Sequence, residues 1–483
     1  MPNQQNLTPP ISIGEIGTRG VIQTGIVDDF LMPNGAVSDV LNLHFDKIGS
    51  ATRRKGVAII DSQIAASAIL GLHQFLDAGA GTDDQLITVN GTVAYYLSGG
   101  SWTSKRTGLT SGKKADFTNF IDLVFMVNGT DAMNTWTGAS GDSFGTTNAV
   151  SAPASHFIEN FRSRVWALKT TTNPSRVTHS SVAASDGTIL WTGDDSSFID
   201  IAPGDGEDIT GGKKFAKALY VFKKNFVYRI YSINETDPDP QIFVGTWSHA
   251  SIELAKNGMY WHHPSGIYRL RRGESQPTEI SKPINDIIQN VSRSFYEDVN
   301  SWSDDDHVYF SVGDVTVNGE TTSNCVVRFT ISTEVWTIYS YAMEIRYGAQ
   351  YDDGTTLLRV VGDDDGNVYT FDSGNDDNGT AINYLLETRS YTLTGLRSET
   401  KTIRQLSALH ENAQGVKLGW RADNMSKSEI KPLGQLENQE SLFKSQDISG
   451  HRIKFNLYGS SLGEPFEFHG FEILEWINEG III

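Results

Sequence analysis

A β-hairpin pattern recurs along the middle of this 483-residue chain and limits its fold more than any other feature. In Leu86–Leu97, "LITVNGTVAYYL", an apolar run is followed by Asn-Gly and then by an aromatic run. Asn-Gly favours a type I′ turn, because both central residues of that turn need a positive φ. The pattern returns, with turns of different lengths, in six further segments: 121–136, 162–181, 217–231, 257–270, 306–330 and 357–372.

These segments start roughly 35 to 55 residues apart, close to the period of about 40–50 residues that is typical of β-propeller blades with four short strands each. A single unit is too small to bury one face of its sheet, so neighbouring units must stack on one another. We therefore predict an all-β protein with a β-propeller of about six or seven blades. Two or more consecutive β-sandwiches are the alternative architecture.

The two ends of the chain differ from this series. Residues 1–65 are rich in Gly, Asn and Asp, whereas residues 385–483 contain longer alternating runs such as "HRIKFNLYG", 451–459. That alternation predicts an antiparallel sandwich with one solvated face. The polar segment 423–446 is low in strand formers and is expected to be a long exposed loop. The predicted domains are thus 1–65 and 385–483, two β-rich regions, with the propeller at 66–384.

Composition restricts the function further. The formal charge is −19 and the pI is about 5.0, so the whole surface cannot hold nucleic acid through clustered Lys and Arg. One basic cluster, Arg53, Arg54 and Lys55, is a candidate contact for an acidic neighbouring subunit, or else a solvated loop. The one cysteine, Cys325, lies in the strand-like "NCVVRF" and is expected to be a buried thiol. The N-terminus has no signal-peptide pattern, and no apolar run approaches ~18 residues.

No motif for catalysis or cofactor binding is complete, and we predict a protein without enzymatic activity or cofactor. Gly141–Gly145 matches G-x-S-x-G, but residues 146–156 are poor helix formers, so a turn is expected. Asp363, Asp365 and Asn367 could offer oxygens to Ca²⁺, yet the bidentate Glu and flanking helices of an EF-hand are missing. These three residues are only weak metal candidates, and a hairpin turn is the preferred interpretation.

Two adjacent histidines, His262 and His263, stand in "NGMYWHHPSGIYRL". Consecutive residues of a strand point to opposite faces, so the pair cannot converge on one zinc ion. We expect one ring to be packed and the other to be solvated, on either side of a hairpin. Gly266–Leu270 repeats the aromatic-Arg sequence of Phe226–Ile230, which favours a further blade.

A carbohydrate-active propeller is the main alternative function. The stretch 183–195, "AASDGTILWTGDD", is similar to the Asp-containing turns of sialidase-type propellers. It occurs once, however, and no arginine triad is identifiable. Two catalytic carboxylates cannot be placed across a glycosidic bond from the sequence. A propeller that only binds host or phage proteins is a third possibility.

Several stretches taken in order resemble the nozzle or tail-hub proteins of short-tailed phages, also described as packaged-DNA stabilisation or tail tubular proteins. The resemblance covers about residues 30–375. It begins at "LMPNGAVSDVLNLHFDKIGSATRRKG" (31–56), continues through "ILGLHQF" (69–75) and the hairpins above, and includes the stretch 190–231, "LWTGDDSSFIDIAPGDGEDITGGKKFAKALYVFKKNFVYRIY". Alanines at 65, 66 and 68 favour a helix over 64–76, but the resemblance implies that "ILGLHQF" is a strand of the first blade.

The resemblance implies a propeller plus a β-rich platform built from both chain ends. It also implies a homohexameric ring in the virion tail, made in the host cytoplasm and located below the portal and its adaptor. The expected partners are the portal-side adaptor, tail fibres or tail spikes, and DNA that passes through the lumen without sequence-specific binding. An acidic lumen would repel phosphate, so DNA could slide and be retained until ejection.

Overall fold

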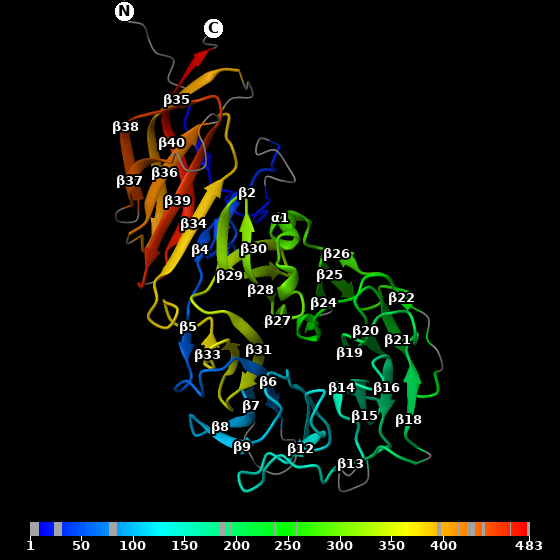
Figure 1. The fold of residues 1–483 in the computed structure, drawn as a ribbon. Helices are drawn as coiled ribbons and strands as arrows, with labels where there is room; N and C mark the ends of the chain where they lie inside the picture. Colours follow the sequence, from blue (N-terminus) through cyan, green and yellow to red (C-terminus); the bar gives the residue numbers. More distant parts are fainter. Residues whose placement is uncertain are drawn as a thin grey trace, which may run out of the picture.

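The computed structural model describes most of the chain, and it is built almost entirely from β-strands (Figure 1). The described residues are 9–23, 31–76, 85–183, 189–193, 195–235, 238, 240–256, 258–393, 398–413, 415–422, 425, 430–436, 440–463 and 465–480. Within them the helical elements are α1 (Asn285–Gln289), η1 (His249–Ser251), η2 (Lys282–Ile284) and η3 (Arg293–Phe295). None of the described helices has the length and hydrophobicity needed to cross a bilayer.

Among the described residues, seven small antiparallel sheets are arranged as a β-propeller (Figure 1). Blade 1 contains β6 (Ile69–Phe75), β7 (Gln85–Asn90), β8 (Val93–Ser98) and β9 (Ser101–Arg106). Blade 2 contains β10 (Asp116–Asn119), β11 (Val124–Val127) and β12 (Asn134–Trp136). Blade 3 contains β14 (Ser155–Phe161), β15 (Arg164–Thr170), β16 (Arg176–His179) and β18 (Ser197–Asp200). A short parallel pair, β13 (Ala149–Val150) and β17 (Ile189–Leu190), lies beside blades 2 and 3.

The remaining four sheets follow the same order of strands. Blade 4 contains β19 (Gly211–Phe215), β20 (Ala218–Phe222), β21 (Val227–Ile230) and β22 (Pro240–Ile242). Blade 5 contains β23 (Glu253–Ala255), β24 (Gly258–His263), β25 (Gly266–Arg271) and β26 (Thr278–Glu279). Blade 6 contains β27 (Asn300–Ser303), β28 (His307–Val317), β29 (Glu320–Thr330) and β30 (Val335–Ser340). Blade 7 contains β31 (Ile345–Asp352), β32 (Leu357–Asp363), β33 (Val368–Phe371) and β5 (Val57–Ile59).

The ring closes through a strand from the N-terminal region. Strand β5 pairs with β33 in the register Tyr369↔Ile59, so the last blade takes its fourth strand from the beginning of the chain. Blade 7 then packs on blade 1, where Gly362 approaches Ile69 so closely that a Cβ at 362 would lie 2.7 Å from the Ile69 methyl. Side chains larger than hydrogen would therefore separate the two blades at this point.

Each pair of neighbouring blades shares its own apolar core. Separate clusters lie between blades 1 and 2, 2 and 3, 3 and 4, 4 and 5, 6 and 7, and 7 and 1. The cluster between blades 5 and 6 is different, because it continues through the segment that holds α1 into the other domain. Stacking between blades thus supplies the burial that no single sheet could provide.

The second domain is a sandwich of two sheets made from both chain ends, which we call the platform (Figure 1). Its first sheet has the order β3 (Leu43–His44), β4 (Ala51–Arg53), β40 (Glu467–Gly480), β35 (Thr400–Glu411) and β38 (Glu440–Gly450), with β1 (Ile11–Ile13) also paired to β40. Its second sheet has the order β2 (Val37–Leu41), β34 (Ile382–Thr388), β39 (Ile453–Ser461), β36 (Lys417–Ala422) and β37 (Lys431–Gln435).

The seven hairpins predicted from the sequence form the second and third strands of the seven sheets. The "ILGLHQF" segment is strand β6, as predicted, and Gly141–Gly145 is a turn. One turn differs from the prediction. Asn90 pairs with Val93, so Gly91 and Thr92 are the central residues and only Gly91 has positive φ. This is the pattern of a type II′ turn, which needs Gly at its first central position, and not of type I′.

Three other predictions are corrected. The domain boundaries lie elsewhere, because 57–59 belong to blade 7 and the platform resumes at Ile382. The segment 423–446 is not one long exposed loop. Its described part contains β37 and the start of β38, which lie at sheet edges. The face of β39 that was expected to be solvated is covered, with Lys454 and Asn456 only 6% and 1% exposed. Both residues donate to Glu387 of the neighbouring strand, so their side-chain nitrogens have an acceptor inside the protein.

Candidate functional sites

The basic cluster predicted from the sequence lies at the junction of the platform and the propeller. Arg54 is 2% exposed and both of its terminal nitrogens donate to Asp377, at 2.7 Å each. Its guanidinium also lies 3.8 Å from the ring centroid of Tyr341. Arg53 is 1% exposed and donates to the carbonyl of Asn375. The prediction that both arginines contact a neighbouring subunit is therefore wrong, because their charges are used within the chain.

Lys55, the third residue of the cluster, is exposed and remains a candidate contact. The cluster was misread because a sequence does not reveal the acidic partner. Asp377 is 323 residues from Arg54 and follows strand β33 of blade 7. A buried guanidinium requires such a bidentate acceptor, since an unpaired buried charge is very costly.

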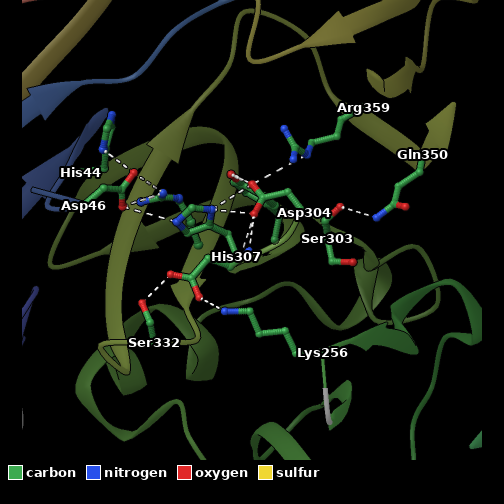
Figure 2. Close-up of polar contacts among 12 residues, drawn as sticks. His44, Asp46, Lys256, Ser303, Asp304, His307, Ser332, Gln350 and Arg359 are labelled. Atoms are coloured by element: carbon green, nitrogen blue, oxygen red, sulfur yellow. Dashed lines mark hydrogen bonds and ion pairs between the residues drawn. The ribbon is translucent and has the colours of Figure 1, made fainter. Parts of the chain in front are cut away.

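A second polar cluster joins the platform to blade 6 (Figure 2). Asp46, just after β3, accepts hydrogen bonds from Arg328 of β29 at 2.6 and 2.8 Å. His307 lies between two carboxylates, with Nδ1 2.7 Å from Asp304 and Nε2 3.4 Å from Asp46. Burial alone would lower the pKa of His307, but the bonds to Asp304 and Asp46 outweigh it and raise that pKa. The same imidazole lowers the pKa of Asp304 to about 2 against the effect of burial.

Arg328 belongs to a repeated set of contacts between blades. Arg229 of β21 donates to the carbonyl of Ser275 in blade 5, and Arg269 of β25 pairs with Glu334 in blade 6 at 2.8 Å. These arginines stand in the aromatic-Arg sequences that were recognised as repeats. In blade 6 the equivalent contact is made by Arg328, whose acceptor is Asp46 of the platform and not the next blade. The platform loop thus takes the place of a blade hairpin.

A cavity with a volume of about 1130 Å³ forms a channel at the centre of the propeller. Residues from the first strand of every blade line it, which places the channel on the axis of the ring. Its wall is polar and carries both charge signs. The charged residues of the lining are Lys113, Lys114, Lys169, Lys213, Lys224, Asp116, Glu207, Asp208, Glu253, Glu297 and Asp298.

The channel wall holds a group of interacting charges. Asp116 is 3.2 Å from Nε2 of His249, and the Gly212 N–H donates to Nδ1 of the same ring. Both ring nitrogens of His249 are therefore engaged, which leaves neither free to act as a general base. Burial raises the pKa of Glu253 to about 7, although Ser303 and Lys213 oppose this shift. Glu253 accepts a hydrogen bond from the Ser303 hydroxyl at 2.6 Å.

One mouth of the channel is partly covered by the segment 293–298, which precedes β27. Lys114, before β10, pairs with Asp298 at 2.6 Å, and Lys224, between β20 and β21, lies 3.4 Å from Glu297. The Tyr296 ring contacts the Trp247 ring with centroids 5.5 Å apart. Contacts with segments next to blades 2, 4 and 5 therefore hold this segment over the channel.

The weak calcium candidates form a hairpin turn. Asp363 is 1% exposed, and its carboxylate accepts bonds from the amides of Asp365 and Asn367, from the Asn367 side chain and from the Tyr369 hydroxyl. Both oxygens already have donors, so this aspartate is used to fix the β32–β33 turn. Among the described residues, three potential ligand groups come together at Glu411, Glu467 and His469 on the platform. There Lys47 already pairs with Glu467 at 2.8 Å.

The two adjacent histidines behave as expected for a strand. His262 is fully buried and His263 is half-buried, with its Nδ1 2.6 Å from the Ser265 hydroxyl. Burial lowers the pKa of His262 to about 3 and that of His263 to about 4. Cys325 is also buried, which raises the pKa of its thiol to about 12. The sialidase-like stretch 183–195 lies partly outside the described residues.

Sequence reasoning missed the channel residues altogether. Asp116, Lys213 and Glu253 lie on the first strands of three blades, outside the hairpins that carried the repeat signal. No motif connects them, since they meet only when the ring closes. The position of these residues could still have identified them, because the strand before each recognised hairpin must line the axis of a propeller.

No family model matches this chain, and no curated protein matches it. Several solved structures share some of its shape. YCF48 from Cyanidioschyzon merolae has 10% identity and a TM-score of 0.43, with 65% of this chain and 98% of that one covered. The designed protein Ika8 has 12% identity and a TM-score of 0.40, with 65% and 98% covered. The AfRom2 CNH domain has 10% identity and a TM-score of 0.40, with 66% and 100% covered. These TM-scores are too low to support conclusions about this chain.

Proposed function

We propose that this chain is a structural subunit of an oligomeric ring in the tail of a short-tailed phage. It would form part of the DNA exit path and retain packaged DNA until ejection. The observation that carries the proposal is the two-part architecture, a propeller beside a platform assembled from residues 11–53 and 382–480. That architecture is what the sequence resemblance to nozzle and tail-hub proteins implies.

The surface charge and the junction support the same role. A chain with a formal charge of −19 repels phosphate, so DNA could pass a ring of such subunits without binding tightly. In a ring that retains DNA, the platform and the propeller of each subunit must also keep a fixed position relative to each other. Buried contacts such as Arg54–Asp377 join the platform to the propeller of one chain.

The proposal is tested by the mass and symmetry of the purified protein and by its presence in virions. Analytical ultracentrifugation should give a closed oligomer, with six copies as the expected number, and single-particle imaging should place the ring in the tail. Lys55→Glu should weaken assembly if this exposed lysine contacts an acidic neighbour. Lys217→Glu, an exposed lysine of the β19–β20 turn, is the matched control. A strictly monomeric protein that is absent from virions would refute the proposal.

A carbohydrate-active or receptor-binding propeller is the second candidate. The observation that favours it is the polar channel, whose wall carries Asp116 and Glu253. Release of reducing sugar from host surface polysaccharide would support a hydrolase or lyase. Loss of that release in Glu253→Gln would assign it to the channel, and the absence of release from wild-type protein would count against enzymatic activity.

A further inference from the structure

We propose that the channel of the propeller is a binding chamber for a neutral, polyhydroxylated ligand, namely a saccharide of a few sugar units. This inference concerns ligand binding by the single chain. It does not depend on ring formation or on any catalytic step, so it can fail or succeed independently of the structural role proposed above.

The chamber has the size and enclosure of a ligand site. Its volume of about 1130 Å³ is slightly larger than the ~300–1,000 Å³ typical of ligand pockets. First strands of all seven blades form its wall, and each is hydrogen-bonded to the second strand of its own blade. A site on strands of this kind is largely preformed.

The wall offers a donor that the protein itself does not use. The backbone of Lys213 belongs to the β19–β20 ladder, but its ammonium makes no hydrogen bond or ion pair with any residue in the described part of the structure. Burial would lower its pKa, but Glu159, Asp116 and Glu253 outweigh burial and raise it, so the ammonium stays charged. An ammonium has three N–H donors, and here they are available to a molecule in the channel.

The channel wall also offers acceptors. Glu253 takes one hydrogen bond from Ser303, and no other described residue donates to its carboxylate. His156 has its pKa lowered by burial first and by Lys169 next, so its neutral ring provides both a donor and an acceptor. A hydroxyl group can donate and accept at the same time. A molecule with several hydroxyls therefore satisfies this mixture better than a group that only donates or only accepts.

The charge of the wall selects against ions. The lining contains five lysines and six carboxylates, so the fixed charges almost cancel. An anion that reached Lys213 would meet the carboxylates of Asp116 and Glu159, whereas a cation would meet the ammonium itself. Either ion would give up its hydration for a poorly matched site. A neutral ligand avoids this cost.

Aromatic rings on the wall suit the apolar faces of sugar rings. Phe157 of β14 is half-buried and packs on His249, with ring centroids 4.8 Å apart. Trp247 lies at the covered mouth, between Lys224 and Tyr296. A pocket that combines a few ring faces with convergent polar groups is the general form of a specific small-molecule site.

The test is isothermal titration of the full chain with uncharged oligosaccharides of two to four glucose, mannose, galactose or N-acetylglucosamine units. At least one should bind with one site per chain and a Kd of about 1 mM or tighter. Lys213→Met keeps the aliphatic stem but removes the donors, and it should weaken binding about tenfold or more. Ala349→Phe, which fills the channel from β31, should abolish it. Lys217→Met changes an exposed lysine of the same hairpin and should bind like wild type.

Thermal unfolding of each variant checks that it is folded, so that loss of binding is not mistaken for loss of structure. The proposal is overturned if no member of the panel binds to wild-type protein. It is also overturned if binding persists in both Lys213→Met and Ala349→Phe, because the ligand then lies elsewhere. Tighter binding of phosphate or spermidine than of any sugar would show that the chamber selects ions, contrary to the charge argument.

Discussion

Six of the seven interfaces between blades have cores of their own, whereas the interface between blades 5 and 6 shares its core with the platform. Trp136 lies in the core between blades 1 and 2. Trp336 of blade 6 lies in the cluster that extends to platform residues such as Phe455. Both indoles are 1% exposed and donate to a backbone carbonyl. The same residue type thus stabilises one blade pair in the first case and joins two domains in the second.

This difference indicates which blades form one cooperative unit with the platform and which do not. The platform is an extension of blades 5 and 6, reinforced by charged contacts to blades 6 and 7. Blades 1 to 4 have no apolar cluster in common with it among the described residues. We therefore expect the far side of the propeller to respond to damage locally and the near side to respond together with the platform.

The largest expected effect comes from truncating the shared core. Trp336→Ala and Trp136→Ala should each lower the free energy of unfolding by about 3–5 kcal/mol. The pattern of hydrogen-exchange protection should distinguish the two variants. Trp336→Ala should reduce protection in platform strands such as β39 as well as in blades 5 and 6, whereas Trp136→Ala should reduce it only around blades 1 and 2. Equal patterns of exchange would contradict the comparison.

The buried ion pair at the junction should have a somewhat smaller effect. Asp377→Ala leaves the Arg54 guanidinium without its acceptor at 2% exposure, and we expect a loss of about 3 kcal/mol. Chemical denaturation measures this loss. Replacing both partners with apolar residues should restore part of the stability, because the unpaired charge is then removed. If the single variant unfolds like wild type, the pair does not fasten the two domains.

The cluster around His307 predicts a pH dependence that is confined to the junction. The folded-state pKa of His307 is raised above its unfolded value near 6.5. The contribution of His307 to the free energy of unfolding is therefore fully present below pH 6.5. It is lost as the pH rises through the folded-state pKa. Comparing thermal unfolding of wild type and His307→Gln between pH 5 and pH 9 isolates this contribution. The difference between the two proteins should shrink towards high pH, and a constant difference would contradict the assignment.

The smallest effect is expected at the exposed contact between blades. Glu334→Ala removes the acceptor of Arg269, whose side chain is only 6% exposed, but Glu334 itself is 53% exposed, so water can take the place of the lost carboxylate. We expect a change of less than about 1 kcal/mol in the free energy of unfolding. Such a variant serves as the matched control for Asp377→Ala, because both remove a carboxylate that binds an arginine. A large effect at 334 would mean that the arginine contacts between blades matter more than the cores.

The sequence predicts the local parts of this fold well and the distant contacts poorly. Strands β24 and β25 could be placed because alternation and the turn at Pro264 are properties of neighbouring residues. The burial of Arg54 could not be predicted, since Asp377 is far away in the sequence. Lys454 was expected in solvent for the same reason, because its partner Glu387 lies 67 residues earlier. The channel group of Asp116, Lys213 and Glu253 arises only when blades are arranged around an axis.

Strand β5 has a consequence for the order in which the protein can fold. Residues 57–59 are made before any blade, yet their partner strand ends at residue 371, so roughly three hundred residues must be synthesised before this pairing can form. The partners of two preceding strands are synthesised later still, because β2 pairs with β34 and β4 pairs with β40. Such distant pairings are slow to form. During synthesis on the ribosome, strands β1, β2, β4 and β5 therefore remain without these distant partners, and they complete both domains only at the end.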